Sequence, residues 1–363
     1  MNTADLTLRN EEKVIFSLRN LYRSYGYRPF RMSKFEEYDL YVRNKSFLVS
    51  DNIITFTDTD GRLLALKPDV TLSIVKNARD GAGLRKVYYN ENVYRPSGDS
   101  RNFREIMQAG LECIGNVDDY CVSEVLRLAQ GSLEVISDDY ALDVSDLGML
   151  SRAIDELALS DDNRAEIVRF IGSKNLHDLT AACAALGIAQ EKTAAVRALL
   201  SCPADPAGAI EALLPVFDDD AWRADVRRFA AILAPLPQGK VRVDFSVIND
   251  FSYYNGIVFQ GFVRGVPEAL LSGGQYDNLM RKMNRTSGAV GFAVYLDRLE
   301  YLPSPAEEYD ADTLLLYSAD DDPAAVARKA ALLAEECGVF AAREIPEKFK
   351  CRRIVRFNGK DGE

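Results

Sequence analysis

Two adjacent tyrosines, Tyr253 and Tyr254, are the residues whose type and setting first suggest a functional site. They lie in the stretch VINDFSYYNGIVF, residues 247–259, which reads as two short strands around a tight Asn-Gly bend. Asn249 and Asp250 precede them, so polar and phenolic groups are expected where the two strands meet. The pattern fits an active site, a binding pocket or a hairpin with aromatic packing, and the stretch alone does not separate the three.

Other familiar kinds of site are disfavoured by the residue types. A single histidine, His177, and six cysteines without a C-x-x-C pair argue against a His/Cys zinc site and against Ser-His-Asp or Cys-His catalysis. The glycine pair of SGGQY, residues 272–276, lacks the strand and helix context of a dinucleotide site, and the sequence has no G-x-x-x-x-G-K-[ST] phosphate loop. No metal or other cofactor is therefore predicted, and the cysteines are expected to be free thiols in a reducing compartment.

Length and composition indicate a globular chain of two or three structural units. It has 363 residues, of which 47% are hydrophobic and 27% charged. No apolar run approaches the ~18 residues that span a bilayer, and the polar start MNTADLTLRNEEK is unlike a signal peptide. A cytoplasmic location without membrane contact is expected. The net charge of −11 opposes binding to tRNA or DNA, because nucleic-acid binders usually present a basic face.

Hydrophobic periodicity and turn residues outline the elements that would position a site. Residues 11–26 form an amphipathic helix that ends at a glycine, and its apolar stripe is predicted to comprise Val14, Leu18, Leu21 and Tyr25. Residues 53–69 form a hairpin that turns at Asp60-Gly61. The runs 85–96 and 106–115 are strands joined by a polar, basic loop, so this part of the chain is a mainly antiparallel sheet.

The character of the chain changes along its length, which suggests four segments. Residues 1–149 are the first part of a sheet-based core, and residues 150–236 are a helical insertion rich in Ala, Leu, Asp and Arg. The β pattern resumes in 237–305, the second part of the core, and 306–363 are a short, truncated C-terminal α/β fragment. The predicted fold class is α+β, with an antiparallel sheet, flanking helices and this helical insertion.

Five blocks in a fixed order carry a resemblance. They are LKPDVT, NVYRPSGDSRNFREIMQAGLE, DFSYYNGIVF, SGGQYDNL and VGFAVYLDRL, all within residues 10–302. Together they resemble the core of the class II aminoacyl-tRNA synthetases, and within that class the histidyl branch. The resemblance implies that Arg95 and Arg298 stand where the synthetases hold ATP. Whether nucleotide binding survives, or both arginines pair with acids as structural residues, stays open.

The same resemblance implies a pocket for free histidine. An ammonium group needs carboxylate and amide oxygens, and an imidazole needs partners for both nitrogens. Asp69, Thr71 and Gln108 match the positions on the ammonium side of the family's pocket. Glu112 and Tyr254 match the imidazole positions, and Arg95, Tyr253 and Tyr276 complete the expected ligand-binding set. A satisfied core polar group or a packed aromatic is the alternative for each.

The chain departs from the synthetase pattern where phosphate is bound. Asn249-Asp250 stands in place of an arginine–glycine pair, and Gly256 and Gln275 replace basic residues. Loss of one preorganised donor costs ~3–4 kcal/mol in a transition state, and a carboxylate beside phosphate adds repulsion on the order of 4 kcal/mol. We therefore expect a binding pocket without catalytic residues, and no aminoacylation.

These departures are similar to those of a known paralogue, the regulatory subunits of ATP phosphoribosyltransferase. The form YYNGIVF at 253–259 also resembles that family. The resemblance implies a role in the first step of L-histidine biosynthesis and in its feedback control. It further implies a hetero-octamer with the short-form catalytic subunit, a homodimer through residues 10–32, histidine as a possible ligand and no tRNA partner.

Two alternatives remain at this stage. One is a degenerate or divergent histidyl-tRNA synthetase-like enzyme, and the other is a stand-alone ligand sensor. A neighbouring gene for a short ATP phosphoribosyltransferase catalytic chain would separate them from the regulatory subunit. The sequence does not decide whether histidine binds this subunit or the catalytic one.

Overall fold

The structure is a computed structural model that describes residues 9–45, 48, 52–78, 80–81, 83–96, 102–248, 253–302 and 309–358. Contacts divide the chain into two compact units, Met1–Leu302 and Pro303–Glu363, and each unit is described by itself. Within the described ranges, no helix combines the length and the apolar composition that a membrane crossing needs.

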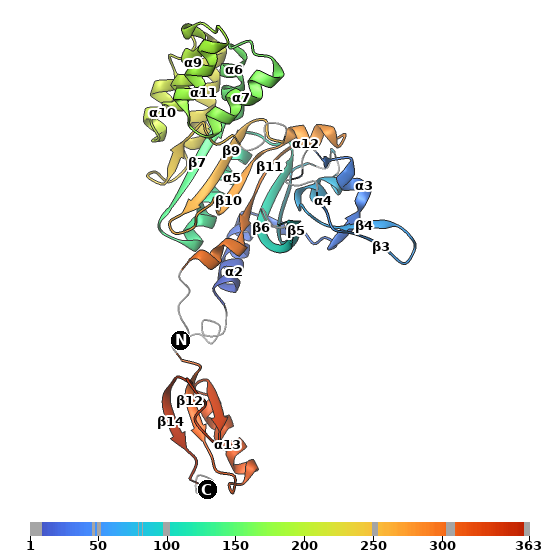
Figure 1. Ribbon diagram of the computed structural model, residues 1–363, viewed down its shortest axis with the longest axis vertical. Coiled ribbons are helices and arrows are strands. Elements are labelled where there is room, and N and C mark those ends of the chain that lie inside the picture. The colour runs from blue at the N-terminus through green and yellow to red at the C-terminus, as the bar shows by residue number, and fades with distance from the viewer. Residues whose placement is uncertain are drawn as a thin grey trace. The chain divides into compact units, whose positions relative to one another are not determined.

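An eight-stranded sheet, counted over the described residues, forms the centre of the first unit (Figure 1). In spatial order its strands are β1 (Arg28–Pro29), β5 (Arg85–Pro96), β6 (Phe103–Gly115), β11 (Gly288–Tyr295), β10 (Leu271–Gln275), β9 (Ile257–Val263), β7 (Tyr140–Asp146) and β8 (Val241–Val243). The strands from β5 to β7 pair antiparallel, whereas β1 and β8 join the two edges in parallel. The mainly antiparallel sheet predicted from the sequence is confirmed.

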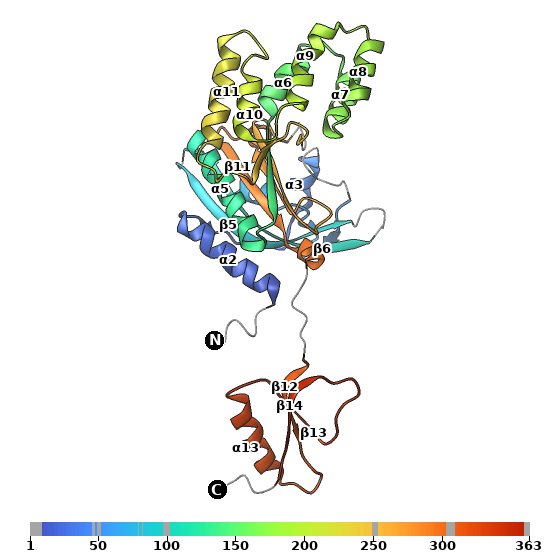
Figure 2. The ribbon, with the colours of Figure 1, turned by 90° about the vertical axis from the view of Figure 1, so that its left-hand side faces the viewer.

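Two packed helices, α2 (Asn10–Ser24) and α5 (Asp119–Ile136), bury their apolar faces in the main core with the sheet (Figure 2). The helix predicted near the N-terminus is confirmed, but its buried stripe lies differently from the prediction. Leu18 is buried as predicted, and Val14 and Leu21 pack partly buried against the core. Tyr25, however, is 38% exposed, and Ile15 and Tyr22 are buried in addition. Tyr22 is drawn inward because its hydroxyl shares a hydrogen bond with Ser132 Oγ at 3.0 Å.

A small second sheet and two short helices lie near β5, toward the edge of the large sheet that β1 forms. The small sheet runs in the order β2 (Phe35–Glu37), β4 (Leu63–Leu66) and β3 (Thr55–Thr57), and the helices are α3 (Tyr38–Val42) and α4 (Thr71–Lys76). The predicted hairpin at Asp60-Gly61 is confirmed as the turn between β3 and β4, where Gly61 has a φ of 80°. Buried Lys67 forms a 2.6 Å ion pair with Glu91 of β5 and so joins this region to the large sheet.

Helices fill the segment in which the sequence predicts a helical insertion. They are α6 (Leu147–Asp155), α7 (Asp161–Gly172), α8 (Leu176–Ala185), α9 (Gln190–Leu200), α10 (Pro206–Leu213) and α11 (Asp220–Leu233). In both views of the ribbon they gather at one end of the sheet, beyond β7 (Figures 1 and 2). Their buried side chains belong to the same core as those of α2 and α5.

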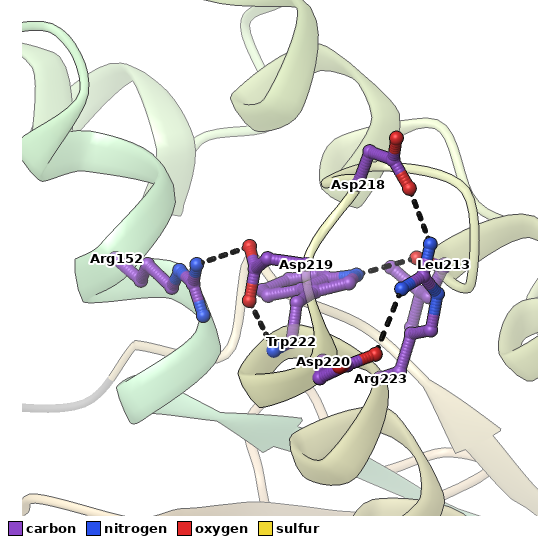
Figure 3. Close-up of polar contacts among 7 residues, drawn as sticks. All are labelled: Arg152, Leu213, Asp218, Asp219, Asp220, Trp222 and Arg223. Carbon is purple, nitrogen blue, oxygen red and sulfur yellow. Dashed lines mark hydrogen bonds and ion pairs between the residues drawn. The ribbon is translucent and has the colours of Figure 1, made fainter.

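A polar clamp ties α6 to α11 (Figure 3). Arg152 on α6 forms a 2.5 Å ion pair with Asp219, and the other oxygen of Asp219 accepts a hydrogen bond from Trp222 N at 2.8 Å. The buried Trp222 indole donates to the carbonyl of Leu213 at 2.7 Å. The Arg152 guanidinium also lies over the aromatic ring of Phe217, 5.0 Å from its centre. One arginine therefore serves an ion pair and a cation–π contact at the same junction.

The second unit contains a parallel three-stranded sheet in its described part. The sheet has the order β13 (Val339–Ala342), β12 (Ala311–Leu316), β14 (Cys351–Arg356), and the chain crosses from β12 to β13 through α13 (Pro323–Ala334). Its small core consists of Leu315, Val326 and Phe357. Strands and one helix thus alternate in this unit, and the division of the chain into four segments stays a prediction.

Candidate ligand-binding site

A cavity of about 370 Å³ is lined by β5, β6, β10, β11 and the segment that leads into α4. The eight residues proposed from the sequence as ligand-binding all line it: Asp69, Thr71, Arg95, Gln108, Glu112, Tyr253, Tyr254 and Tyr276. They come from parts of the chain that are separated by more than two hundred residues, from Asp69 to Tyr276. The antiparallel register brings them together, since Gln108 pairs with Tyr295 and Glu112 with Gly291 on β11.

Glu112 lies at the buried end of this set. It shares one face of β6 with Gln108, four residues earlier, because side chains alternate along a strand. Only 2% of Glu112 is exposed, and its two oxygens accept hydrogen bonds from Thr71 Oγ1 at 2.9 Å and from the Tyr276 hydroxyl at 2.6 Å. Burial raises the pKa of Glu112 to about 8, although both hydrogen bonds oppose this shift. A buried carboxyl with this pKa can hold a proton near neutral pH.

Asp69 and Arg95 form a second polar group in the cavity. Asp69 Oδ1 accepts a hydrogen bond from Leu72 N at 2.8 Å, at the start of α4, and its other oxygen lies 3.8 Å from Arg95 Nη2. Burial raises the pKa of Asp69, while the Arg95 charge opposes the rise. Arg95 is held by a 2.7 Å hydrogen bond from its Nε to the carbonyl of Pro68. A carboxyl and a guanidinium therefore stand side by side, as a zwitterionic amino acid requires.

Gln108 contributes an unsatisfied donor. It is 3% exposed and lines the cavity, and its Nε2 has no hydrogen-bond partner among the described residues. A buried amide without a partner costs free energy, so a ligand that supplies an acceptor would be stabilised here.

Tyr253 and Tyr254 form an aromatic wall of the cavity. The ring centres of Tyr253 and Tyr254 are 4.5 Å apart, and Tyr253 lies 5.8 Å from Tyr276. Burial raises the pKa of Tyr253 and of Tyr276 well above 10, so both hydroxyls stay neutral. Of the three readings of this stretch, the geometry fits a pocket.

The prediction of two strands around this bend is confirmed for the second strand, which is β9, and wrong for Val247 and Ile248, the described start of the first. Strand β8 ends at Val243, and the described residues 244–248 are not in a strand. They begin with a local turn, in which Asp244 Oδ1 accepts hydrogen bonds from Ser246 N at 3.0 Å and from Ser246 Oγ at 2.7 Å. Residues 249–252, which include Asn249 and Asp250, lie outside the described residues.

Comparison with known proteins identifies the family. The sequence profile described as "Histidyl-tRNA synthetase" matches residues 5–299 of the chain. The chain belongs to this family. The resemblance predicted from the five ordered blocks is therefore confirmed.

The relatives of this chain carry one of two names. The chain is 25% identical over 315 residues to an ATP phosphoribosyltransferase regulatory subunit from Oceanobacillus iheyensis, covering 84% of this chain and 77% of the relative. Other relatives of similar identity are named either regulatory subunit or histidine–tRNA ligase. The predicted resemblance to the regulatory subunits is confirmed.

Solved structures agree with the fold. An ATP phosphoribosyltransferase regulatory subunit/histidyl-tRNA synthetase from Bacillus halodurans superposes with a TM-score of 0.78 at 21% identity, covering 95% of this chain and 93% of that one. A chain of the ATP phosphoribosyltransferase (HisG:HisZ) complex from Thermotoga maritima gives a TM-score of 0.62 at 19% identity, with 79% and 97% covered. The predicted class II synthetase-like fold is confirmed.

The two arginines that the resemblance places at an ATP site differ in their position relative to the cavity. Arg95 lines the cavity, whereas Arg298, on the 3-10 helix η2 (Leu296–Tyr301), is not among its lining residues. Arg298 forms an ion pair with Glu268, donates to the carbonyl of Ala269 and lies 4.6 Å from the ring centre of Tyr295. Arg298 thus pairs with an acid in this structure, and nucleotide binding by Arg95 and Arg298 stays a prediction.

Several lining residues are not predicted from the sequence, among them Tyr89, Ser272, Gly291, Phe292, Ala293 and Tyr295. Four of them lie in the block VGFAVYLDRL, in which the resemblance points only to Arg298. Packing explains why position 291 is a glycine: a Cβ there would lie 1.7 Å from Glu112 Oε2. The glycine is needed because the buried carboxyl occupies that space.

Proposed function

We propose that this protein is the non-catalytic regulatory subunit of ATP phosphoribosyltransferase. It serves the first step of L-histidine biosynthesis, in which ATP reacts with phosphoribosyl pyrophosphate, and it takes part in feedback control by histidine. One observation carries the proposal: the cavity keeps the carboxyl, amide and phenol groups of an amino-acid site, whereas Gly256 and Gln275 stand where the resemblance expects basic residues. The names of the relatives support the same role.

Histidine fits the chemistry of the cavity. Its ammonium group is placed against Asp69, Thr71 and the amide oxygen of Gln108, and its imidazole against Glu112 and Tyr254. The guanidinium of Arg95 is positioned for the ligand carboxylate, and Tyr253 and Tyr276 provide the wall. Each charged group of the amino acid then meets a group of opposite charge or a hydrogen-bond partner.

Amino-acid activation is not expected from this site. Arg298 is engaged by Glu268 and Ala269 rather than directed at the cavity, and Asn249-Asp250 replaces the arginine–glycine pair of the synthetases. Removal of one preorganised donor to a developing anion costs ~3–4 kcal/mol. The complex is the glycosyltransferase, and this subunit contributes binding and regulation.

Its partners follow from the same role. We expect a homodimer through residues 10–32, because β1 is an edge strand of the large sheet and two aromatic side chains beside it are exposed: Phe16 of α2 by 49% and Tyr25, the C-cap of α2, by 38%. We expect this dimer to join the short-form catalytic subunit in a hetero-octamer in the cytoplasm, without tRNA.

A mixing experiment tests the proposed function. The purified chain is combined with a short-form ATP phosphoribosyltransferase catalytic subunit, mass is followed by light scattering, and turnover is followed by phosphoribosyl-ATP formation. A larger complex with increased turnover is expected. Unchanged mass together with unchanged turnover would contradict the regulatory role, and histidine-dependent pyrophosphate exchange by the chain alone would favour a divergent synthetase-like enzyme.

Calorimetry with L-histidine tests the cavity. Binding to the wild type is expected, with weaker binding to Glu112→Gln. A matched control is Glu211→Gln, which changes an exposed glutamate of α10 and should bind like the wild type. Equal affinity of the wild type and both variants for L-histidine would mean that histidine acts at another site in feedback control.

A further inference from the structure

A second cavity, of about 700 Å³, lies between the helical insertion and strand β8 at the edge of the large sheet. Its walls come from α10 and α11, which lie side by side (Figure 2), from the connection 236–239 and from β8 itself. Most of the lining is aliphatic, with Ile210, Leu233 and Val241 among it. This β8 cavity shares no lining residue with the amino-acid cavity. Its volume lies within the ~300–1,000 Å³ that is usual for ligand sites.

Strand β8 turns part of its backbone toward this side. It is an edge strand and pairs in parallel with β7. Leu142 N donates to the carbonyl of Lys240 at 2.8 Å, and Asp244 N donates to the carbonyl of Val144 at 2.9 Å. In this register the even-numbered residues 240, 242 and 244 serve the ladder with β7. The N–H and C=O groups of Val241 therefore point away from β7, at the open edge of the sheet.

The chain itself supplies one partner on this edge. Val243 N donates to the carbonyl of Ala204 at 2.8 Å, as it would to a residue of an added strand. The described residues provide no such backbone partner for the N–H or the C=O of Val241, although only 4% of Val241 is exposed. Buried backbone groups are nearly always paired. Beyond Ala204, the edge thus lacks the partner that a further strand would supply.

A carboxylate without a cation stands at the rim of the β8 cavity. Asp205 caps α10, and its Oδ1 accepts a hydrogen bond from Gly208 N at 2.7 Å. Within the part of the chain that the structure describes, no lysine or arginine forms an ion pair with Asp205, whereas Arg242, which also lines the cavity, is paired with Asp143. A positively charged group of an occupant would therefore complement the rim.

We propose that the β8 cavity binds an extended peptide segment of a partner protein, which adds as a short strand beside β8. The backbone of this segment accepts a hydrogen bond from Val241 N–H and donates one to Val241 C=O. A large aliphatic side chain of the segment fills the space between α10 and α11, and a lysine or arginine beside it pairs with Asp205. The inference is independent of the proposed function, because it uses no residue of the amino-acid cavity.

The polar groups of the cavity favour a peptide over a compact apolar molecule. They are the backbone groups of one strand edge, and the contact between Val243 and Ala204 already shows the pairing that a peptide would continue. A compact apolar molecule would leave both the Val241 N–H and the Asp205 charge without a partner. Strand addition to a sheet edge gains affinity from main-chain hydrogen bonds and specificity from pockets for alternate side chains.

Titration of the full chain with a labelled peptide tests the inference. The probe is the acetylated and amidated pentapeptide Lys-Leu-Val-Leu-Lys, and fluorescence anisotropy follows its binding. Saturable binding to the wild type is expected. Ala230→Phe fills the cavity and should weaken binding at least about tenfold. Asp205→Asn keeps the cap of α10 but removes the charge, and should weaken binding about two- to fivefold.

Matched controls separate the cavity from general effects of the substitutions. Ala331→Phe and Asp162→Asn change exposed residues of α13 and α7 and should bind the peptide like the wild type. A peptide with proline in place of the central valine lacks one backbone N–H and should bind at least about fivefold more weakly. A peptide with glutamates in place of the lysines should also bind more weakly than the original.

Hydrogen–deuterium exchange of the wild type reports strand addition directly, even if a variant does not fold. The bound peptide should slow exchange of the Val241 amide at least about tenfold. Absence of saturable binding, or equal binding of the valine and proline peptides, would overturn the inference. Unchanged exchange at Val241 with bound peptide would overturn it as well. Protection of Val241 by dimerisation of the chain alone would assign the edge to a second copy and likewise overturn the inference.

Discussion

The side-chain oxygen of Gln275 occupies the space that a side chain at position 256 would need. A Cβ on Gly256 would lie 2.3 Å from Gln275 Oε1, and the same oxygen accepts a hydrogen bond from Ile257 N at 2.9 Å. These are two positions at which the resemblance expects basic residues. Their replacements are coupled by packing, so a basic side chain at 256 does not fit without movement of Gln275.

We predict that Gly256→Ala lowers the free energy of unfolding by about 1–3 kcal/mol, because the added methyl overlaps Gln275. Gln275→Ala should also destabilise the protein, since Ile257 N loses its acceptor. The double variant should lose less free energy of unfolding than the two single variants lose together, and the difference, the coupling energy, should be ~0.5–3 kcal/mol. Urea denaturation of the four proteins measures this cycle, and additive effects would contradict the coupling.

Gly291→Ala is predicted to disturb the cavity more directly. The new Cβ would lie 1.7 Å from Glu112 Oε2 and 2.4 Å from the carbonyl of Leu111, which is backbone and cannot turn away. We expect a loss of about 1–3 kcal/mol or more in stability together with loss of histidine binding. Gly338→Ala is the matched control, because the nearest atom to its Cβ is 3.5 Å away. A Gly291→Ala protein with wild-type stability and affinity would show that Glu112 does not need its observed position.

Much of the site could be predicted because it lies in contiguous blocks. Alternation along one strand places Gln108 and Glu112 on the same face, and the order of the blocks points to Asp69 and Tyr276. The sequence could not predict that Thr71 and Tyr276 hydrogen-bond the two oxygens of Glu112, because those contacts depend on the register of β6 and β11 and on the loops beside them.

Other features depend on contacts that the neighbouring sequence does not reveal. The partner of Arg298 is Glu268, thirty residues earlier and outside every recognised block. In the predicted stripe of α2 only Tyr25 is wrong: the apolar face that contains Leu18 extends to either Tyr22 or Tyr25, and the hydrogen bond with Ser132 favours Tyr22. Val247 and Ile248, predicted as strand, follow a turn in which one side chain, Asp244, accepts a hydrogen bond from Ser246 N.

The clamp between α6 and α11 gives a prediction about the helical insertion (Figure 3). Arg152→Ala removes the pair with Asp219 and the contact with the Phe217 ring, and should cost about 1–3 kcal/mol of stability. Arg43→Ala is the control, because its ion pair with Asp39 is exposed and should contribute less than about 1 kcal/mol. Equal changes in melting temperature for the two variants would contradict a structural role for the clamp.

Glu112 also predicts how the stability of the ligand-free protein depends on pH. Its folded pKa of about 8 lies above the ordinary value of 4.5. Below the ordinary value the carboxyl is protonated in both states and has no effect. As pH rises toward 8, the unfolded chain loses this proton while the folded protein keeps it, so the free energy of unfolding falls. The slope is at most on the order of 1.4 kcal/mol for each pH unit, and it vanishes above the folded pKa.

Glu112→Gln removes this contribution, because an amide does not titrate and can still hydrogen-bond Thr71 and Tyr276. The stability of the variant relative to the wild type should therefore increase between about pH 5 and pH 8 and then level off. Melting temperatures of both proteins across this range, with Glu211→Gln as a control, measure the difference. The control should parallel the wild type at every pH. A constant difference between Glu112→Gln and the wild type would mean that Glu112 is ionised in the folded protein, and a cation outside the described contacts would then have to compensate it.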